Sequence, residues 1–165
     1  MNWIFGDNIN TDLITPGRYN ITTDPAKLKA IAFIEYRPEF AQHVQAGDFV
    51  IGGKNFGCGS SRETAAIALQ ACGVRVIFAK SFARIFYRNC MNQGLLAILT
   101  DTSAINETDI LQFDEHEKLL TNVTKNTKTP LDVPEMMMTL HEVGGIVAYI
   151  QKYGLSSIST LVGKV

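Results

Sequence analysis

Three short apolar runs alternate with helical patterns in the middle of the chain. The runs Asp48–Gly53, Val74–Lys80 and Leu95–Leu99 have the length and the aliphatic or aromatic side chains of buried strands. Between them, residues Arg62–Cys72 and Phe82–Asn92 place small or apolar side chains at helical spacing. Because strand and helix alternate, we predict an α/β fold built on a parallel, right-handed βαβαβ core.

Glycine and serine residues mark the ends of the two helices. Gly73 and Gly94 lie where each helical pattern stops, which is typical of a helix C-terminus. Ser81 precedes the second helix and is a candidate for its N-cap. The two boundaries support the same strand–helix–strand order.

The last third of the chain is more polar. Residues 106–129 are rich in turn formers with short apolar pieces, so we predict a hairpin outside the core. Pro134 suits the first turn of a helix, which the glycine pair 144–145 interrupts and Ile146–Tyr153 continues or restarts. The Ser-rich segment 154–165 is expected to be a flexible tail.

Composition limits the possible functions. The chain has 165 residues and is 46% hydrophobic, which predicts one domain covering residues 1–165. Its net charge of −1 gives no basic footprint for nucleic acid. The apolar runs are too short to cross a membrane. Three widely spaced cysteines form neither a disulfide framework nor a zinc pattern, so a cytoplasmic location is expected.

A glycine-rich loop follows the first apolar run. Residues 52–63 read Gly-Gly-Lys-Asn-Phe-Gly-Cys-Gly-Ser-Ser-Arg-Glu, which matches neither the P-loop nor the dinucleotide fingerprint. Glycines let the backbone approach a ligand, and the start of the next helix offers free N–H groups. Arg62 adds a planar fork suited to a carboxylate or phosphate. We therefore predict a site for a small anion at the strand ends.

The same loop also has a structural interpretation. Ser60 and Glu63 fit a capping box, in which both side chains satisfy N–H groups at the helix start. A cation such as Arg62 is disfavoured by the helix dipole in the first turn of a helix, which favours a ligand-binding role for it. Both interpretations are compatible if one serine caps the helix and the other faces a substrate. For Cys58 we favour a small buried residue over a nucleophile, because no histidine partner is evident.

Two arginines on the second helix stay open to two interpretations. Arg84 and Arg88 are one turn apart and lie opposite the apolar side of their helix. Like charges at this spacing slightly destabilise a helix unless an anionic group faces them. They form either a solvated stripe or a surface for something acidic.

Three segments together carry a family resemblance. Gly6–Tyr19, Gly52–Glu63 and Lys80–Asn89 occur in the order and with the residues of the small subunits of 3-isopropylmalate dehydratase, which are similar to the swivelling C-terminal domain of aconitase. The resemblance covers almost the whole chain. It implies a swivelling β/β/α three-layer domain around the parallel core.

The resemblance also implies an activity. Such enzymes isomerise 2-isopropylmalate and 3-isopropylmalate through 2-isopropylmaleate in leucine biosynthesis, with a [4Fe–4S] cluster on a separate large subunit and no cofactor on the small one. By similarity, Ser60 is the catalytic base, and Ser61 and Arg62 hold a substrate carboxylate. Asp12 organises the loop and its hydrogen bonds. The expected partners are the large subunit, a small hydroxy-dicarboxylate and, for the isolated chain, further copies of itself.

The resemblance bears on substrate choice as well. Its specificity loop places Arg18 and Ile21 among the substrate-binding residues, and the apolar Ile21 suits an alkyl group. Asn20 departs from the leucine usual in the family. Dimethylmalate, citramalate-type substrates and homoaconitate remain alternatives. A non-catalytic assembly subunit or a carboxylate-binding module is the alternative from another class.

Overall fold

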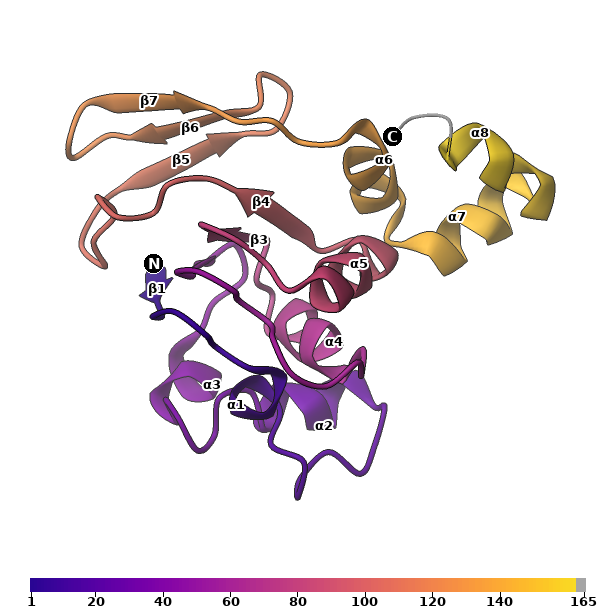
Figure 1. Ribbon diagram of the computed structural model, residues 1–165, viewed down its shortest axis with the longest axis horizontal. Helices are drawn as coiled ribbons and strands as arrows, with labels where there is room; N and C mark the ends of the chain where they lie inside the picture. Colours follow the sequence, from indigo (N-terminus) through magenta and orange to yellow (C-terminus); the bar gives the residue numbers. More distant parts are fainter. Residues whose placement is uncertain (163–165) are drawn as a thin grey trace.

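A four-stranded parallel sheet forms the centre of the molecule. The computed structural model describes residues 1–162, and residues 163–165 lie outside the described part. The strands are β1 (Asn2–Ile4), β2 (Phe49–Ile51), β3 (Val76–Ala79) and β4 (Leu96–Leu99), in that order across the sheet (Figure 1). The three strands expected from the apolar runs are confirmed. The sequence pattern missed β1, which pairs with β2 across more than forty residues of chain.

Two helices connect the central strands, as predicted. Helix α4 (Thr64–Ala71) joins β2 to β3, and α5 (Arg84–Gln93) joins β3 to β4, so the parallel βαβαβ core is confirmed. Both begin two residues later than their patterns suggested. The expected cap at Ser81 is wrong: its Oγ accepts a hydrogen bond from the Asn55 N–H instead, and α5 has no side-chain cap.

A second sheet covers the open face of the first. The segment expected as a hairpin forms three antiparallel strands, β5 (Leu111–Asp114), β6 (Leu119–Asn122) and β7 (Thr127–Pro130). Phe113 of β5 packs edge-on against the fully buried Phe78 of β3, with ring centroids 5.7 Å apart. With helices on the far side of the parallel sheet, this gives the expected β/β/α layers (Figure 1).

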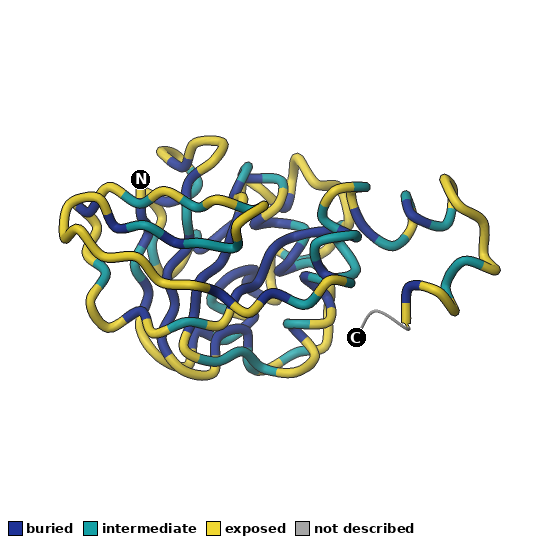
Figure 2. The backbone as a smooth tube through the Cα atoms, turned by 90° about the horizontal axis from the view of Figure 1, so that it is seen from above, coloured by how far each residue is buried: buried dark blue, intermediate teal, exposed yellow. Residues whose placement is uncertain are grey.

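Short helices in the first third of the chain complete the helical layer. They are α1 (Thr11–Ile14), α2 (Pro25–Ala30) and α3 (Glu39–His43). Phe40 of α3 is buried together with Phe5 and Phe33, and the Phe5 and Phe33 rings stack at 4.1 Å. The core is continuous from these helices through the parallel strands, which run as the dark interior of Figure 2.

The C-terminal part forms a helical arm that extends from the layers (Figure 1). Helices α6 (Glu135–Val143) and α7 (Ile146–Tyr153) meet at the glycine pair, as expected. A 3₁₀ turn (Leu155–Ser157) and α8 (Ile158–Val162) follow, so most of the segment expected as a tail is helical; its flexibility stays a prediction. Among the described residues, none of the helices is long and apolar enough to cross a membrane.

Candidate active site

The first half of the glycine-rich loop pairs with the segment that follows β1. The Gly53 N–H donates to the Gly6 carbonyl at 3.2 Å, and the Asn8 N–H donates to the Lys54 carbonyl at 2.8 Å. The Asp7 carboxylate accepts from the Lys54 N–H at 2.6 Å. Two motifs that are far apart in the sequence are thereby joined at the carboxyl ends of neighbouring parallel strands, where α/β sheets place ligands.

The second half of the loop lies on the start of α1. The Gly57 N–H donates to the Ile9 carbonyl, and the Thr11 N–H donates to the Cys58 carbonyl, both at 2.7 Å. The buried Thr11 hydroxyl then accepts from the Ser60 N–H at 2.9 Å. Thr11 therefore sets the backbone position of Ser60.

The third motif supports the loop from the other side. Phe56 is fully buried, and its backbone N–H and C=O pair with the Ser81 carbonyl and the Ala83 N–H, each at 2.9 Å. Its ring packs against Phe86 of α5 with centroids 5.7 Å apart. The buried Asn89 side chain donates to the Ser61 carbonyl at 3.2 Å. These contacts fix the loop relative to α5.

The structure brings three of the predicted site residues together. Ser60 is half-buried, whereas Asp12 and Arg62 are exposed. A Cβ atom placed at Gly17 would lie 3.7 Å from Asp12 Oδ1 and 3.7 Å from Arg62 Nη1, so both groups approach the same point. Neither takes part in an ion pair with another described residue. An exposed guanidinium beside a serine loop can bind a carboxylate.

The capping interpretation of Ser60 is wrong. Helix α4 begins at Thr64, and Glu63 occupies its N-cap position without a side-chain cap. The Ser60 Oγ instead accepts a hydrogen bond from the Arg62 N–H at 3.3 Å. Arg62 therefore precedes the helix rather than lying inside its first turn. The Ser60 oxygen is left with a backbone donor directed at it.

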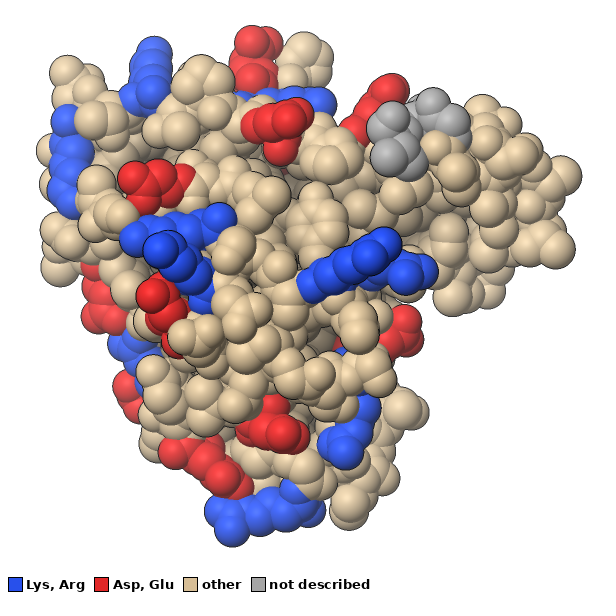
Figure 3. All heavy atoms as spheres, in the orientation of Figure 1, with Lys and Arg blue, Asp and Glu red and all other residues tan. Residues whose placement is uncertain are grey.

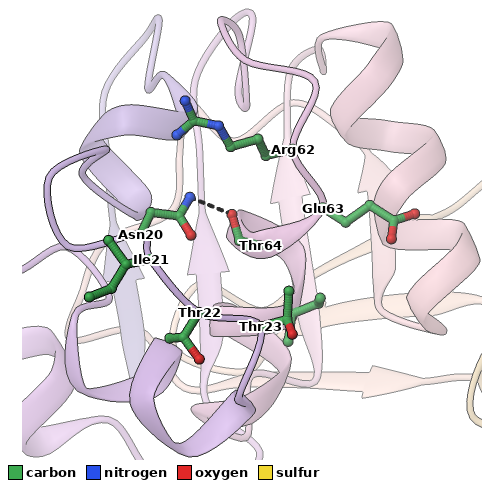
Figure 4. Close-up of a pocket in the computed structure, with 8 residues that line it drawn as sticks. Asn20, Ile21, Thr22, Thr23, Arg62, Glu63 and Thr64 are labelled. Carbon is green, nitrogen blue, oxygen red and sulfur yellow. Dashed lines mark hydrogen bonds between the residues drawn. The ribbon is translucent and has the colours of Figure 1, made fainter.

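An open depression of about 770 Å³ lies beside Arg62. Its lining residues are Asn20, Ile21, Thr22, Thr23, Arg62, Glu63, Thr64 and Ile67. Ile21 is 88% exposed, and the Asn20 side chain donates to the Thr64 Oγ1 at 2.7 Å (Figure 4). The Glu63 carboxylate points away from this group in Figure 4. The loop that carries Ile21 is thus tied to the start of α4.

Arg18 lies apart from this depression. Its guanidinium forms an ion pair with Glu35 and lies over the Tyr19 ring. It lines a neighbouring depression of about 360 Å³, which Ile21 also borders. The structure therefore places Ile21 with Arg62, and leaves Arg18 at the adjoining surface. Sequence reasoning missed the Asn20–Thr64 bond, because its partners are 44 positions apart.

The three cysteines do not fit a cluster ligand set. Cys58 is half-buried in the site loop, whereas Cys72 and Cys90 are buried. Burial raises the pKa of the Cys72 thiol to about 11 and also raises the pKa of the Cys90 thiol. Within residues 1–162, no group of three or more His, Cys, Asp or Glu side chains could hold a metal ion.

The fold and the site together define a class of protein. A β/β/α domain that carries a glycine-rich Ser-Ser-Arg loop at the ends of its parallel strands is a swivelling domain of the aconitase type. The family described as the aconitase C-terminal domain matches residues 4–103, and the chain belongs to that family. The resemblance recognised in the sequence is confirmed.

Relatives with curated names extend this comparison. The 3-isopropylmalate dehydratase small subunit of Wolinella succinogenes is 46% identical over 149 residues, covering 89% of each chain. The methanogen homoaconitase small subunit of Methanocaldococcus jannaschii is 43% identical over 90% of this chain and 88% of its own. A crystal structure of 3-isopropylmalate dehydratase from the same archaeon superposes with a TM-score of 0.88 at 39% identity, covering 96% of both chains.

Proposed function

We propose that this chain is the small subunit of a hydro-lyase that interconverts 2-isopropylmalate and 3-isopropylmalate through 2-isopropylmaleate, a step of leucine biosynthesis. The names of its relatives support this assignment. The observation that carries it is the convergence of Asp12 and Arg62 at Gly17, beside the loop of Ser60. A base and a carboxylate-binding cation are what the dehydration of a hydroxy-dicarboxylate requires.

Ser60 acts as the base in this proposal. It takes the proton from the carbon next to the hydroxyl-bearing carbon; the C–H electron pair becomes the double bond as the hydroxyl leaves. Addition of water in the opposite sense yields the isomer. A serine oxygen needs stabilisation as an anion, and the Arg62 N–H that already donates to Ser60 Oγ supplies one donor.

Arg62 and Ser61 hold a substrate carboxylate. The guanidinium can bind it through two parallel hydrogen bonds. The contacts refine the proposed role of Asp12. The Thr11 hydroxyl accepts from the Ser60 N–H, whereas Asn10 caps α1 by accepting from the Leu13 N–H. Asp12 Oδ1 and Arg62 Nη1 each lie 3.7 Å from the same Cβ position at Gly17. Asp12 would orient the guanidinium rather than the backbone.

The [4Fe–4S] cluster belongs to the large subunit in this proposal. When bound there, it would act as a Lewis acid on the leaving hydroxyl. Arg62 is exposed and Ser60 is half-buried in the same loop, which suits a site completed by a second subunit. The small-subunit names of the relatives imply such a partner.

Ile21 is the proposed determinant of substrate choice. Its exposed side chain borders the same depression as Arg62, so an alkyl group can contact Ile21 while a carboxylate reaches the guanidinium. An extra carboxylate would have no cationic partner at Ile21, which costs binding free energy. Isopropylmalate is therefore favoured over homoaconitate, the substrate class named for one relative. Dimethylmalate and citramalate-type substrates contain alkyl groups too and remain alternatives.

Reconstitution with the cluster-bearing large subunit tests the function. The complex should turn over isopropylmalate with a higher kcat/KM than homoaconitate. Ile21→Arg should lower the ratio of kcat/KM for isopropylmalate to that for homoaconitate by about tenfold, because the arginine supplies a charge-assisted partner to the extra carboxylate. Ile110→Arg is the matched control, since Ile110 is also exposed but lies next to the antiparallel sheet. An unchanged substrate ratio in Ile21→Arg would contradict this specificity assignment.

A further inference from the structure

The arginines of the chain fall into two groups. Arg18, Arg37 and Arg75 each form an ion pair with a glutamate. The other three are Arg62, Arg84 and Arg88; within residues 1–162 none of them forms an ion pair. All three unpaired guanidinium groups lie in the site loop or in α5, the helix that supports it.

Arg84 and Arg88 form an exposed surface on α5 together with Ile85. The two arginines are one helical turn apart, and the side chain of the adjacent Ile85 is 49% exposed. Figure 3 shows basic side chains gathered over α5 on this face. We call these three residues the α5 ridge. Neither the like charges nor the exposed isoleucine stabilises the isolated chain.

Helix α5 is held firmly against the site loop. The Phe86 ring contacts Phe56 and lies so close to Gly57 that a Cβ atom there would come within 2.1 Å of it. The Asn89 side chain bonds the Ser61 carbonyl. A surface that docks on the α5 ridge is therefore placed at a defined distance from Ser60.

We propose that the α5 ridge docks on the large subunit, at an acidic surface beside its cluster opening that also offers an apolar contact to Ile85. This inference rests on the proposed function. Arginine suits such an interface because its guanidinium binds carboxylates in a bidentate manner and is weakly hydrated. Acidic side chains of the partner would attract both guanidinium groups and so offset the repulsion between Arg84 and Arg88.

The experiment measures the affinity between the two subunits. The cluster-loaded large subunit is titrated with wild-type chain, with Arg84→Gln, with Arg88→Gln and with the double variant, at low and at high salt. The double variant should weaken the Kd by about tenfold or more at low salt, and the salt dependence should become shallower. Ile85→Ala should weaken the Kd without changing the salt dependence. Lys128→Gln, on the exposed strand β7, is the matched charge control and should bind as wild type.

The outcomes separate this inference from the proposed function. With the large subunit in saturating excess, the variants should regain the wild-type kcat and KM, because the ridge does not touch substrate. An unchanged Kd and salt dependence would overturn the docking proposal while leaving the activity assignment intact. A raised KM at unchanged Kd would also overturn it, since the arginines would then face substrate. Failure of the wild-type complex to turn over isopropylmalate would instead contradict the proposed function.

Discussion

Replacing Gly57 by alanine should destabilise the protein by much more than a surface substitution does. Gly57 has a φ of +78°, in the left-handed region. Its new Cβ atom would lie 2.1 Å from Cγ of Phe86, far inside the normal contact distance. Phe86 cannot easily move away, because it is 1% exposed and packs against the rings of Phe56 and Phe82.

Two further glycines allow the cost of the left-handed backbone to be separated from the cost of the steric clash with Phe86. Gly47 has a φ of +91° with nothing within 4 Å of its Cβ position, so Gly47→Ala should cost only the backbone term, about 1–2 kcal/mol. Gly6 has neither a left-handed φ nor a neighbour within 4 Å, and Gly6→Ala should stabilise by about 0.4–1 kcal/mol. Gly57→Ala adds overpacking of about 1–3 kcal/mol to the backbone term, for a total of about 2–5 kcal/mol.

Urea unfolding of the isolated chain measures all three changes in the free energy of unfolding. A double-mutant cycle with Phe86→Ala sharpens the test, because loss of the ring removes the two nearest atoms and should lower the cost of Gly57→Ala. The Phe86 Cβ remains 2.5 Å from the new atom, so the cost should stay above that of Gly47→Ala. Equal costs for Gly57→Ala and Gly47→Ala in the wild-type background would refute the packing argument. The contact between Phe86 and the site loop would then not be a steric constraint.

Three other predictions concern the site. Ser60→Ala should abolish turnover in the reconstituted complex but change the free energy of unfolding by less than about 0.5 kcal/mol, because Ser60 does not cap α4; normal kcat would make Ser61 the candidate base. Asn20→Leu and Thr64→Val should show a coupling free energy of about 0.5–1.5 kcal/mol in a double-mutant cycle of urea unfolding, which is the net value of the hydrogen bond between the two side chains. Additive effects of the two substitutions would argue that this hydrogen bond does not contribute to stability. The chain purified anaerobically by itself should contain no iron–sulfur cluster by absorbance and iron analysis, and a stoichiometric cluster would contradict the division between subunits.

The sequence by itself determined the parts of the structure that depend on local pattern. Apolar runs of strand length predicted β2, β3 and β4, and Gly73, Gly94 and the glycine pair 144–145 correctly marked helix ends. These signals are local because burial on a strand or a helix face repeats every few residues. The glycine-rich loop could also be placed at the strand ends, because it lies between a strand-like apolar run and a helical pattern in the sequence.

The tertiary structure alone decided which groups meet. β1 is three residues long and is defined by its pairing with β2, so no periodic pattern could reveal it. The capping box at Ser60 was a plausible local signal, but the Ser60 N–H bonds Thr11, 49 positions away, and the helix starts later. The approach of Asp12 to Arg62 at Gly17 likewise depends on the path of the folded chain. Contacts between distant segments follow from how the layers pack, which local preference does not encode.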